Sequence, residues 1–176
     1  MKKSLIALAV TFSLVAFSGC GKKEIAQHEK VTIDKGQVAT KIAIGSNLDT
    51  LNLKDQFDKN GTINTSTKKA VFAFTKPTGH LVIEYLNTQG EDFLAKNNIQ
   101  VIADVSRIPS IILNYVVLSD LQKSKYQILM FLDEKVSAEY RNEKNPDSIM
   151  VVTLDNLKVT GVSFVTSLDD FKKEIE

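Results

Sequence analysis

The chain has 176 residues, a formal net charge of +1, no tryptophan and one cysteine. A charge balance this close to neutral excludes a bulk attraction to nucleic acid, so we expect no nucleic-acid partner. One cysteine cannot form a disulfide within the chain, so burial must stabilise the fold.

The first 19 residues have the layout of a secretory signal peptide. Lys2 and Lys3 precede an apolar run over 5–17. This run is shorter than the roughly 20 apolar residues that cross a bilayer. We therefore predict a cleaved signal peptide over 1–19, and its removal changes the formal net charge to −1.

Phe17-Ser18-Gly19-Cys20 resembles the bacterial lipobox. The resemblance implies cleavage before Cys20 and acylation of its sulfur, and several acyl chains on one residue suffice for stable attachment to a lipid bilayer. Gly21, which is not the aspartate that retains enteric lipoproteins, implies the periplasmic face of the outer membrane in the bacterial cell envelope. An ordinary secreted protein with an unrelated cysteine is the alternative.

Residues 20–36 are predicted to be the lipidated N-terminus and a tether, because their closely spaced charges leave no apolar face. His28 lies in this segment and is interpreted as a solvated linker histidine. The remaining residues, 37–176, are predicted to form one domain.

The first half of the domain mixes predicted strands and one helix. Residues 38–45 suit an edge strand, and Asn60-Gly61 is typical of a turn. A compact apolar run over 69–74 predicts a buried strand. The apolar spacing over 82–94 then predicts a helix, with Gly90 as its weak point.

The second half continues the alternation. Residues 99–103 and 126–132 predict two more buried strands. Residues 110–123 favour a helix, with a strand as the alternative because several apolar residues are β-branched. Residues 134–147 are read as a polar connection.

The chain ends in a predicted hairpin and helix. Residues 148–154 and 157–166 alternate around Asp155-Asn156, a two-residue turn, and Ser167 begins a capping box. Strand–helix–strand units imply parallel pairing, and the hairpin adds antiparallel strands. We therefore predict an α/β fold with a mixed central sheet and flanking helices.

Thr75-Lys76-Pro77-Thr78 follows the first core strand, and Asn145-Pro146 precedes the hairpin. With this order of elements, the chain resembles the thioredoxin-like superfamily in its peroxiredoxin- and TlpA-like form. The segments 132–135 and 149–155 are similar to the YtfJ-type periplasmic branch. The resemblance implies that Cys-x-Pro-Cys stands at 75–78 in redox members, and that the facing proline is commonly cis.

The replacement of both motif cysteines by threonine bears on the chemistry. Thiol–disulfide exchange needs a thiolate, and a threonine hydroxyl cannot supply one. We therefore predict that the protein is not an enzyme, with no dithiol oxidoreductase activity and no cofactor. Thr75 and Thr78 are interpreted mainly as helix caps.

The preferred hypothesis is a module that binds an envelope protein or peptide. Its predicted groove consists of Thr75, Lys76, Pro77, Thr78, His80, Asn145 and Pro146. The first alternative is a metal or acid–base site formed by His80, Glu84 and Asp104, because two of these lie four residues apart on one predicted helix. The second alternative is a structural component of the envelope.

Overall fold

The structure is a computed structural model that describes residues 30–176. The predicted signal peptide, Cys20, His28 and most of the predicted tether lie outside these residues. No helix within 30–176 is long and apolar enough to cross a membrane.

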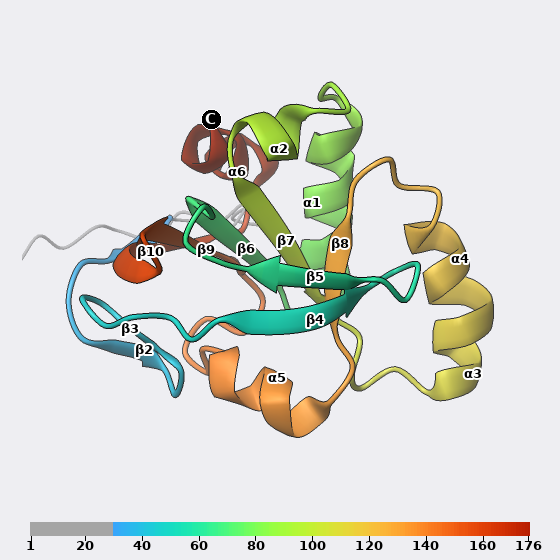
Figure 1. The fold of residues 1–176 in the computed structure, drawn as a ribbon, viewed down its shortest axis with the longest axis horizontal. Coiled ribbons are helices and arrows are strands. Elements are labelled where there is room, and N and C mark those ends of the chain that lie inside the picture. Colours follow the sequence, from blue (N-terminus) through green and yellow to red (C-terminus); the bar gives the residue numbers. More distant parts are fainter. Residues whose placement is uncertain (1–29) are drawn as a thin grey trace, which may run out of the picture.

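An eight-stranded mixed sheet forms the centre of the domain, in the order β1-β10-β9-β6-β7-β8-β4-β5 (Figure 1). Its strands are β1 (Val31–Ile33), β4 (Leu51–Asp55), β5 (Asn60–Ile63), β6 (Lys69–Ala73), β7 (Ile99–Asp104), β8 (Ile128–Phe131), β9 (Ile149–Asp155) and β10 (Lys158–Val165). Among these strands, only β6, β7 and β8 run parallel to one another, and all other pairings in the sheet are antiparallel. The predicted mixed α/β sheet is therefore confirmed.

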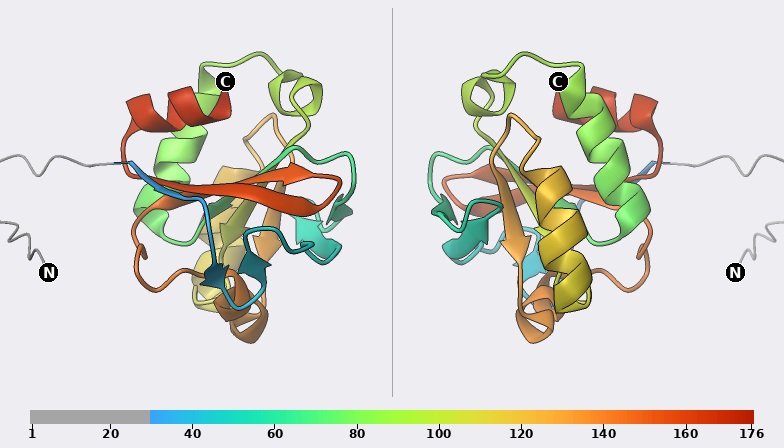
Figure 2. Two further views of the ribbon diagram at one scale, coloured as in Figure 1. Left: turned by 90° about the vertical axis from the view of Figure 1, so that its left-hand side faces the viewer. Right: turned by 90° about the vertical axis from the view of Figure 1, so that its right-hand side faces the viewer.

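Helices and a small second sheet cover both faces. The helical segments are α1 (Lys76–Asn87), α2 (Phe93–Lys96), α3 (Ser110–Ile112), the π-helical η1 (Leu113–Val117), α4 (Leu118–Leu121), α5 (Glu134–Tyr140) and α6 (Leu168–Ile175). Helices α1 and α6 pack on one face, and α5 lies on the other with β2 (Gln37–Ala39) and β3 (Ile42–Ala43) (Figure 2).

Alternation along the strands divides the core into two clusters. In β6, Val71 faces the cluster under α1 and α6, whereas Phe72 faces the cluster under α5. Phe72 stacks on Phe131 and on Tyr140 with ring centroids 6.2 and 6.1 Å apart. Successive side chains of a strand point to opposite faces, so this one strand anchors both layers.

The predicted turn at Asn60-Gly61 is wrong, because both residues belong to β5. The chain instead reverses between β4 and β5 around Asp58, which has a φ of 61°. A Cβ atom at position 61 would collide with the Leu129 side chain. The glycine therefore serves close packing against β8 and not the turn.

Several predicted boundaries also differ. Residues 31–33, within the predicted tether, pair with β10 as β1. The predicted edge strand over 38–45 is instead the short β2–β3 pair, whose two strands are separated by a turn. The predicted connection over 134–147 contains α5, and the predicted helix over 82–94 ends at Asn87, before Gly90, and resumes as α2. The final hairpin and helix are confirmed.

Residues 110–121 are helical, as the preferred prediction has it, but the segment is irregular. Its three parts α3, η1 and α4 follow one another without a break, with π geometry in the middle. None of its residues is buried. We call this continuous segment the 110–121 helix.

Candidate functional site

The candidate site lies at the carboxyl edge of the parallel strands. Because β6, β7 and β8 are parallel, their carboxyl ends meet at one edge of the sheet. Thr75 stands just beyond β6, Asp104 ends β7 and Leu132 follows β8. Every loop that leaves this edge can therefore contribute side chains to one surface.

Thr75 and Thr78 form the N-terminus of α1. The Thr78 hydroxyl donates to the Thr75 carbonyl at 2.8 Å and accepts from the Thr75 backbone N–H at 3.1 Å. The two hydroxyl oxygens are 3.1 Å apart. Thr78 is buried, so its hydroxyl is used inside the fold to cap the helix.

Between and beyond these threonines, the motif faces solvent. Lys76, Pro77 and His80 are exposed, and so is Glu84 one turn further along α1. Proline at the start of a helix loses no hydrogen bond, which explains why position 77 tolerates it. The outward side chains of the motif are free to contact another molecule, whereas Thr78 is not.

The loop with Asn145 and Pro146 lies at the same edge. Strands β6 and β9 are antiparallel, with Phe72 opposite Met150. The segment that precedes β9 therefore lies beside the end of β6. The Asn142 carboxamide oxygen accepts from the backbone N–H of Asn145 at 3.0 Å and orders the loop. No peptide bond within 30–176 is cis, so the implied cis proline is not found.

The structure does not bring Asp104 to His80 and Glu84. In β7, Ile102 faces the cluster under α5, and Asp104, two residues later, points to that same face. Helix α1, which carries His80 and Glu84, packs on the opposite face. The predicted metal or acid–base set is therefore wrong in its geometry.

Asp104 instead belongs to a buried network. One carboxylate oxygen accepts from the backbone and hydroxyl of Ser106, at 3.0 and 2.6 Å. The other accepts from the Ser137 hydroxyl and from the Arg141 guanidinium, each at 2.6 Å. Burial raises the pKa of Asp104, but these hydrogen bonds outweigh it and hold the pKa below its ordinary value.

Sequence reasoning missed Arg141 and Ser137. Ser137 lies in α5 and Arg141 directly follows its last residue, in a segment read as a connection, and the Arg141 guanidinium donates to the Ser137 hydroxyl at 3.1 Å. The Arg141 guanidinium also lies 5.7 Å from the centre of the Phe74 ring. The network thus attaches α5 to the end of β7.

The described residues hold no group of three or more histidine, cysteine, aspartate or glutamate side chains arranged to bind a metal ion. A groove of about 430 Å³ lies near the site, between the β4–β5 turn and the inner side of the 110–121 helix. Phe57, Leu118 and Leu132 are among its lining residues.

No protein-family model matches the sequence, and no curated protein matches it either. Solved structures do match by shape. They include the peroxidoxin BcpB from Mycobacterium tuberculosis, with 13% identity over 75% of this chain and 92% of that chain and a TM-score of 0.51. A putative thiol:disulfide interchange protein DsbE from Chlorobium tepidum has 10% identity over 76% and 96% and a TM-score of 0.53.

A putative protein disulfide isomerase from Bacteroides thetaiotaomicron matches similarly, with 12% identity over 76% of this chain and 86% of that chain and a TM-score of 0.52. The chain has the thioredoxin-like fold. Identities this low show the fold alone, and they carry no activity or substrate to this chain. Within that fold, α1 is the helix whose N-terminus bears the Thr75–Thr78 motif.

The prediction that the protein is not an enzyme is contradicted by these neighbours. Their names are those of a peroxidoxin, a thiol:disulfide interchange protein and a protein disulfide isomerase. The thioredoxin-like fold is thus one that redox enzymes use. Thr75 and Thr78 show only that the two motif positions lack cysteine. The one cysteine of the chain is Cys20.

Proposed function

We propose that the protein is a lipid-anchored component of the bacterial cell envelope whose thioredoxin-like domain binds a protein or peptide segment. The binding surface consists of the 75–80 motif and the Asn145-Pro146 loop. The anchor is the acylated Cys20, and the bilayer is the periplasmic face of the outer membrane.

The observation that carries this proposal is the division of the motif into an inner and an outer side. Thr78 is buried and bonded to Thr75, while Lys76, Pro77 and His80 are exposed. Pro146 is exposed on the adjoining loop. Exposed side chains on loops held by a rigid sheet are common sites of recognition.

Apolar side chains around the same edge support a protein or peptide as the ligand. Leu132 follows β8 and is 51% exposed, and Val136 on α5 is 38% exposed. Cationic Lys76, at the start of α1, and Arg107, on the loop that leaves β7, are exposed nearby. A mixed surface of apolar and charged groups is the usual composition of a transient protein interface.

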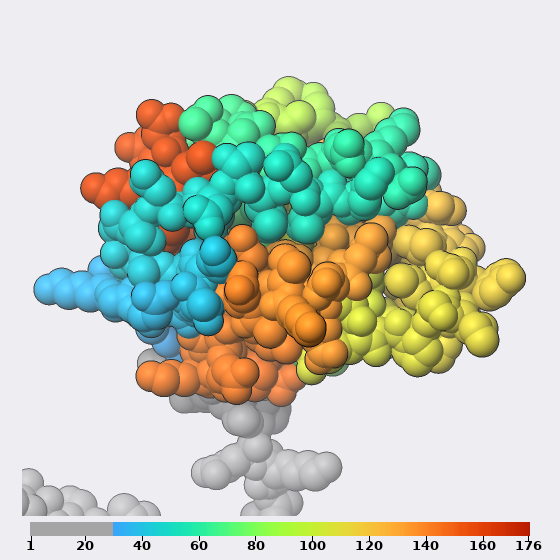
Figure 3. Space-filling view, turned by 60° about the horizontal axis from the view of Figure 1, so that its bottom comes forward, coloured from blue at the N-terminus to red at the C-terminus, as the bar shows by residue number. Residues whose placement is uncertain are grey.

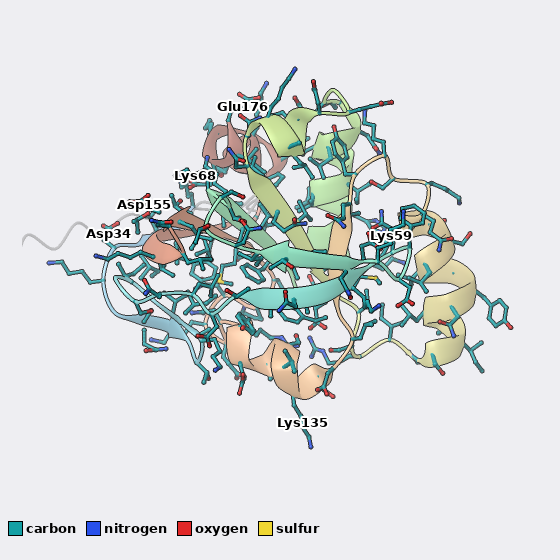
Figure 4. The ribbon with its side chains drawn as sticks, viewed as in Figure 1. Asp34, Lys59, Lys68, Lys135, Asp155 and Glu176 are labelled. Carbon is teal, nitrogen blue, oxygen red and sulfur yellow. The ribbon has the colours of Figure 1, made fainter. Side chains whose placement is uncertain are left out.

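The test is photo-crosslinking in intact cells with the full-length chain. A photoreactive residue replaces Pro77, which is exposed beside the capped threonines. The matched control carries the same residue at position 158, which is exposed on β10 at the opposite edge of the sheet. Figure 4 shows these two ends, with Lys135 on α5 at one and Lys68 with Asp155 at the other.

We expect one enriched envelope protein from position 77 and none from position 158. Replacing Lys76 and His80 by alanine, with the photoreactive residue kept at position 77, should abolish the adduct, and thermal unfolding of that variant checks that the fold is intact. Equal capture from both positions would contradict the binding surface. A soluble protein that leaves with the periplasmic fraction would contradict the anchor separately.

A further inference from the structure

The 110–121 helix has the composition of a buried helix but not its environment. Eight of its twelve residues are apolar, yet none is buried. Helices that are apolar on most sides are normally covered. In the space-filling view this segment projects from the body of the domain beside α5 (Figure 3).

Four large apolar side chains form its outer side. Ile111 is 73% exposed, Ile112 49%, Tyr115 80% and Val116 54%. Their spacing places them on one stripe, while Leu113 and Leu118 line the groove on the inner side. The outer stripe is therefore separate from the groove.

The stripe is arranged symmetrically about the middle of the helix, between residues 113 and 114. In an antiparallel pair of two such helices related by a twofold axis there, Ile111 of one copy meets Val116 of the other, and Ile112 meets Tyr115. Self-complementarity of this kind is what a twofold interface between identical chains requires. No charged residue interrupts the span from Ser110 to Ser119.

The charges at its two ends follow the same symmetry. Arg107 lies four residues before Ile111, and Asp120 lies four residues after Val116. Arg107 lies on the turn that leads into the helix and Asp120 in its last turn, so an antiparallel pair brings the positive end of one copy to the negative end of the other. Asp120 already pairs with Lys123 at 2.7 Å, but both are exposed, so that pair contributes little and leaves Asp120 available.

The bilayer is a less suitable occupant of the stripe. The described chain begins beside β1, at one end of the strand order, whereas the 110–121 helix follows β7 and reaches β8 near the other end. Neighbouring strands are about 4.8 Å apart, so a tether from Lys30 leaves from the far side of the domain. A twofold pair leaves both tethers at its outer ends.

We propose that the outer stripe of the 110–121 helix is the interface of a twofold dimer of this chain. This inference does not depend on the peptide surface at the 75–80 motif. Four side chains from each copy make a small interface, so the dimer is reversible and weak. Anchoring in one membrane raises the effective concentration of the copies.

The test uses the full-length chain in membranes, expressed as two differently tagged copies. One copy carries Ile112→Cys and the other Tyr115→Cys, and a mild oxidant is added. We expect a mixed disulfide at least fivefold above that of a control pair in which Thr160→Cys, exposed on β10, replaces Tyr115→Cys. The parent chain corrects for any unacylated Cys20.

A charge exchange then tests the twofold geometry. Arg107→Asp or Asp120→Arg alone should lower the yield of mixed disulfide at least threefold, and the double variant should restore it. Phe57→Ser removes an apolar side chain that is 50% exposed but lies off the stripe, and it should change nothing. A mixed disulfide at the control level, or single charge reversals that do not change its yield, would overturn the dimer. A photo-crosslink from Val116 to lipid or to another protein would overturn it as well.

Discussion

Two helical segments leave the same edge of the sheet, and they are stabilised in opposite ways. Helix α5 is short and polar, yet it buries Ser137 and Tyr140 and is fastened by the Asp104–Arg141 ion pair. The 110–121 helix is longer and largely apolar, yet none of its residues is fully buried. An apolar helix can therefore belong either to the core or to a surface that another chain covers.

The same difference separates structural from functional roles. Removing a side chain from α5 breaks contacts that hold the domain together. Removing one from the outer side of the 110–121 helix takes away a side chain that is about half or more exposed to solvent, and this costs little stability. Variants of the two segments should therefore divide cleanly between folding stability and association.

The largest expected effect comes from a matched pair of tyrosines. Tyr140→Ala should lower the free energy of unfolding by about 4 kcal/mol, because the ring is 4% exposed, stacks on Phe72 and packs against Phe131. Tyr115→Ala, at 80% exposure, should change it by less than about 0.5 kcal/mol. Urea unfolding under dilute conditions measures both, and similar losses would contradict the comparison.

The next effect concerns the buried ion pair. Asp104→Asn should lower the free energy of unfolding by about 3 kcal/mol, because it leaves the Arg141 guanidinium buried without a charged partner. Lys54→Met is the control, since it removes the exposed Lys54–Asp58 pair and should cost under about 1 kcal/mol. Equal costs would show that the network does not fasten α5.

This difference between the parent chain and Asp104→Asn should also depend on pH. The folded state holds the pKa of Asp104 below its ordinary value of 3.8, so the unfolded state binds the proton first. The stabilisation is complete well above pH 3.8 and is lost as the pH falls through the folded pKa. Unfolding curves at successively lower pH should therefore converge, and a gap that widens would contradict the sign.

The smallest effect on stability is expected at the motif. Thr78→Val should lower the free energy of unfolding by about 1 kcal/mol, because the Thr75 backbone N–H loses its acceptor. Lys76→Ala, exposed between the threonines, should leave stability unchanged while it weakens crosslinking from position 77. Thermal unfolding and the in-cell adduct separate the two roles.

The sequence predicts the order of elements well where apolar periodicity is strong. Residues 69–74, 99–103 and 126–132 are buried strands because continuous apolar runs suit strands covered on both faces. Helix α5 was missed because its buried residues include a serine, which hydropathy does not single out. The turn predicted at Asn60-Gly61 is wrong because close packing against Leu129, and not only a turn, requires glycine.

The candidate site was predictable only in part. The 75–78 motif could be placed because it follows a buried strand and opens a helix. The predicted set of His80, Glu84 and Asp104 is wrong because residues near one edge of a sheet can lie on either of its faces. The alternation along β7, which puts Asp104 on the same face as Ile102, does indicate the face of Asp104. The exposure of the 110–121 helix depends on tertiary packing and leaves no mark in its periodicity.

Amide hydrogen exchange of the full-length chain at increasing protein concentration tests the central contrast most directly. We predict that the 110–121 helix exchanges fast when the protein is dilute and becomes protected as its concentration rises, while α5 stays protected throughout. Protection of the 110–121 helix that is already equal to that of α5 in dilute protein, or that never changes with concentration, would contradict the account.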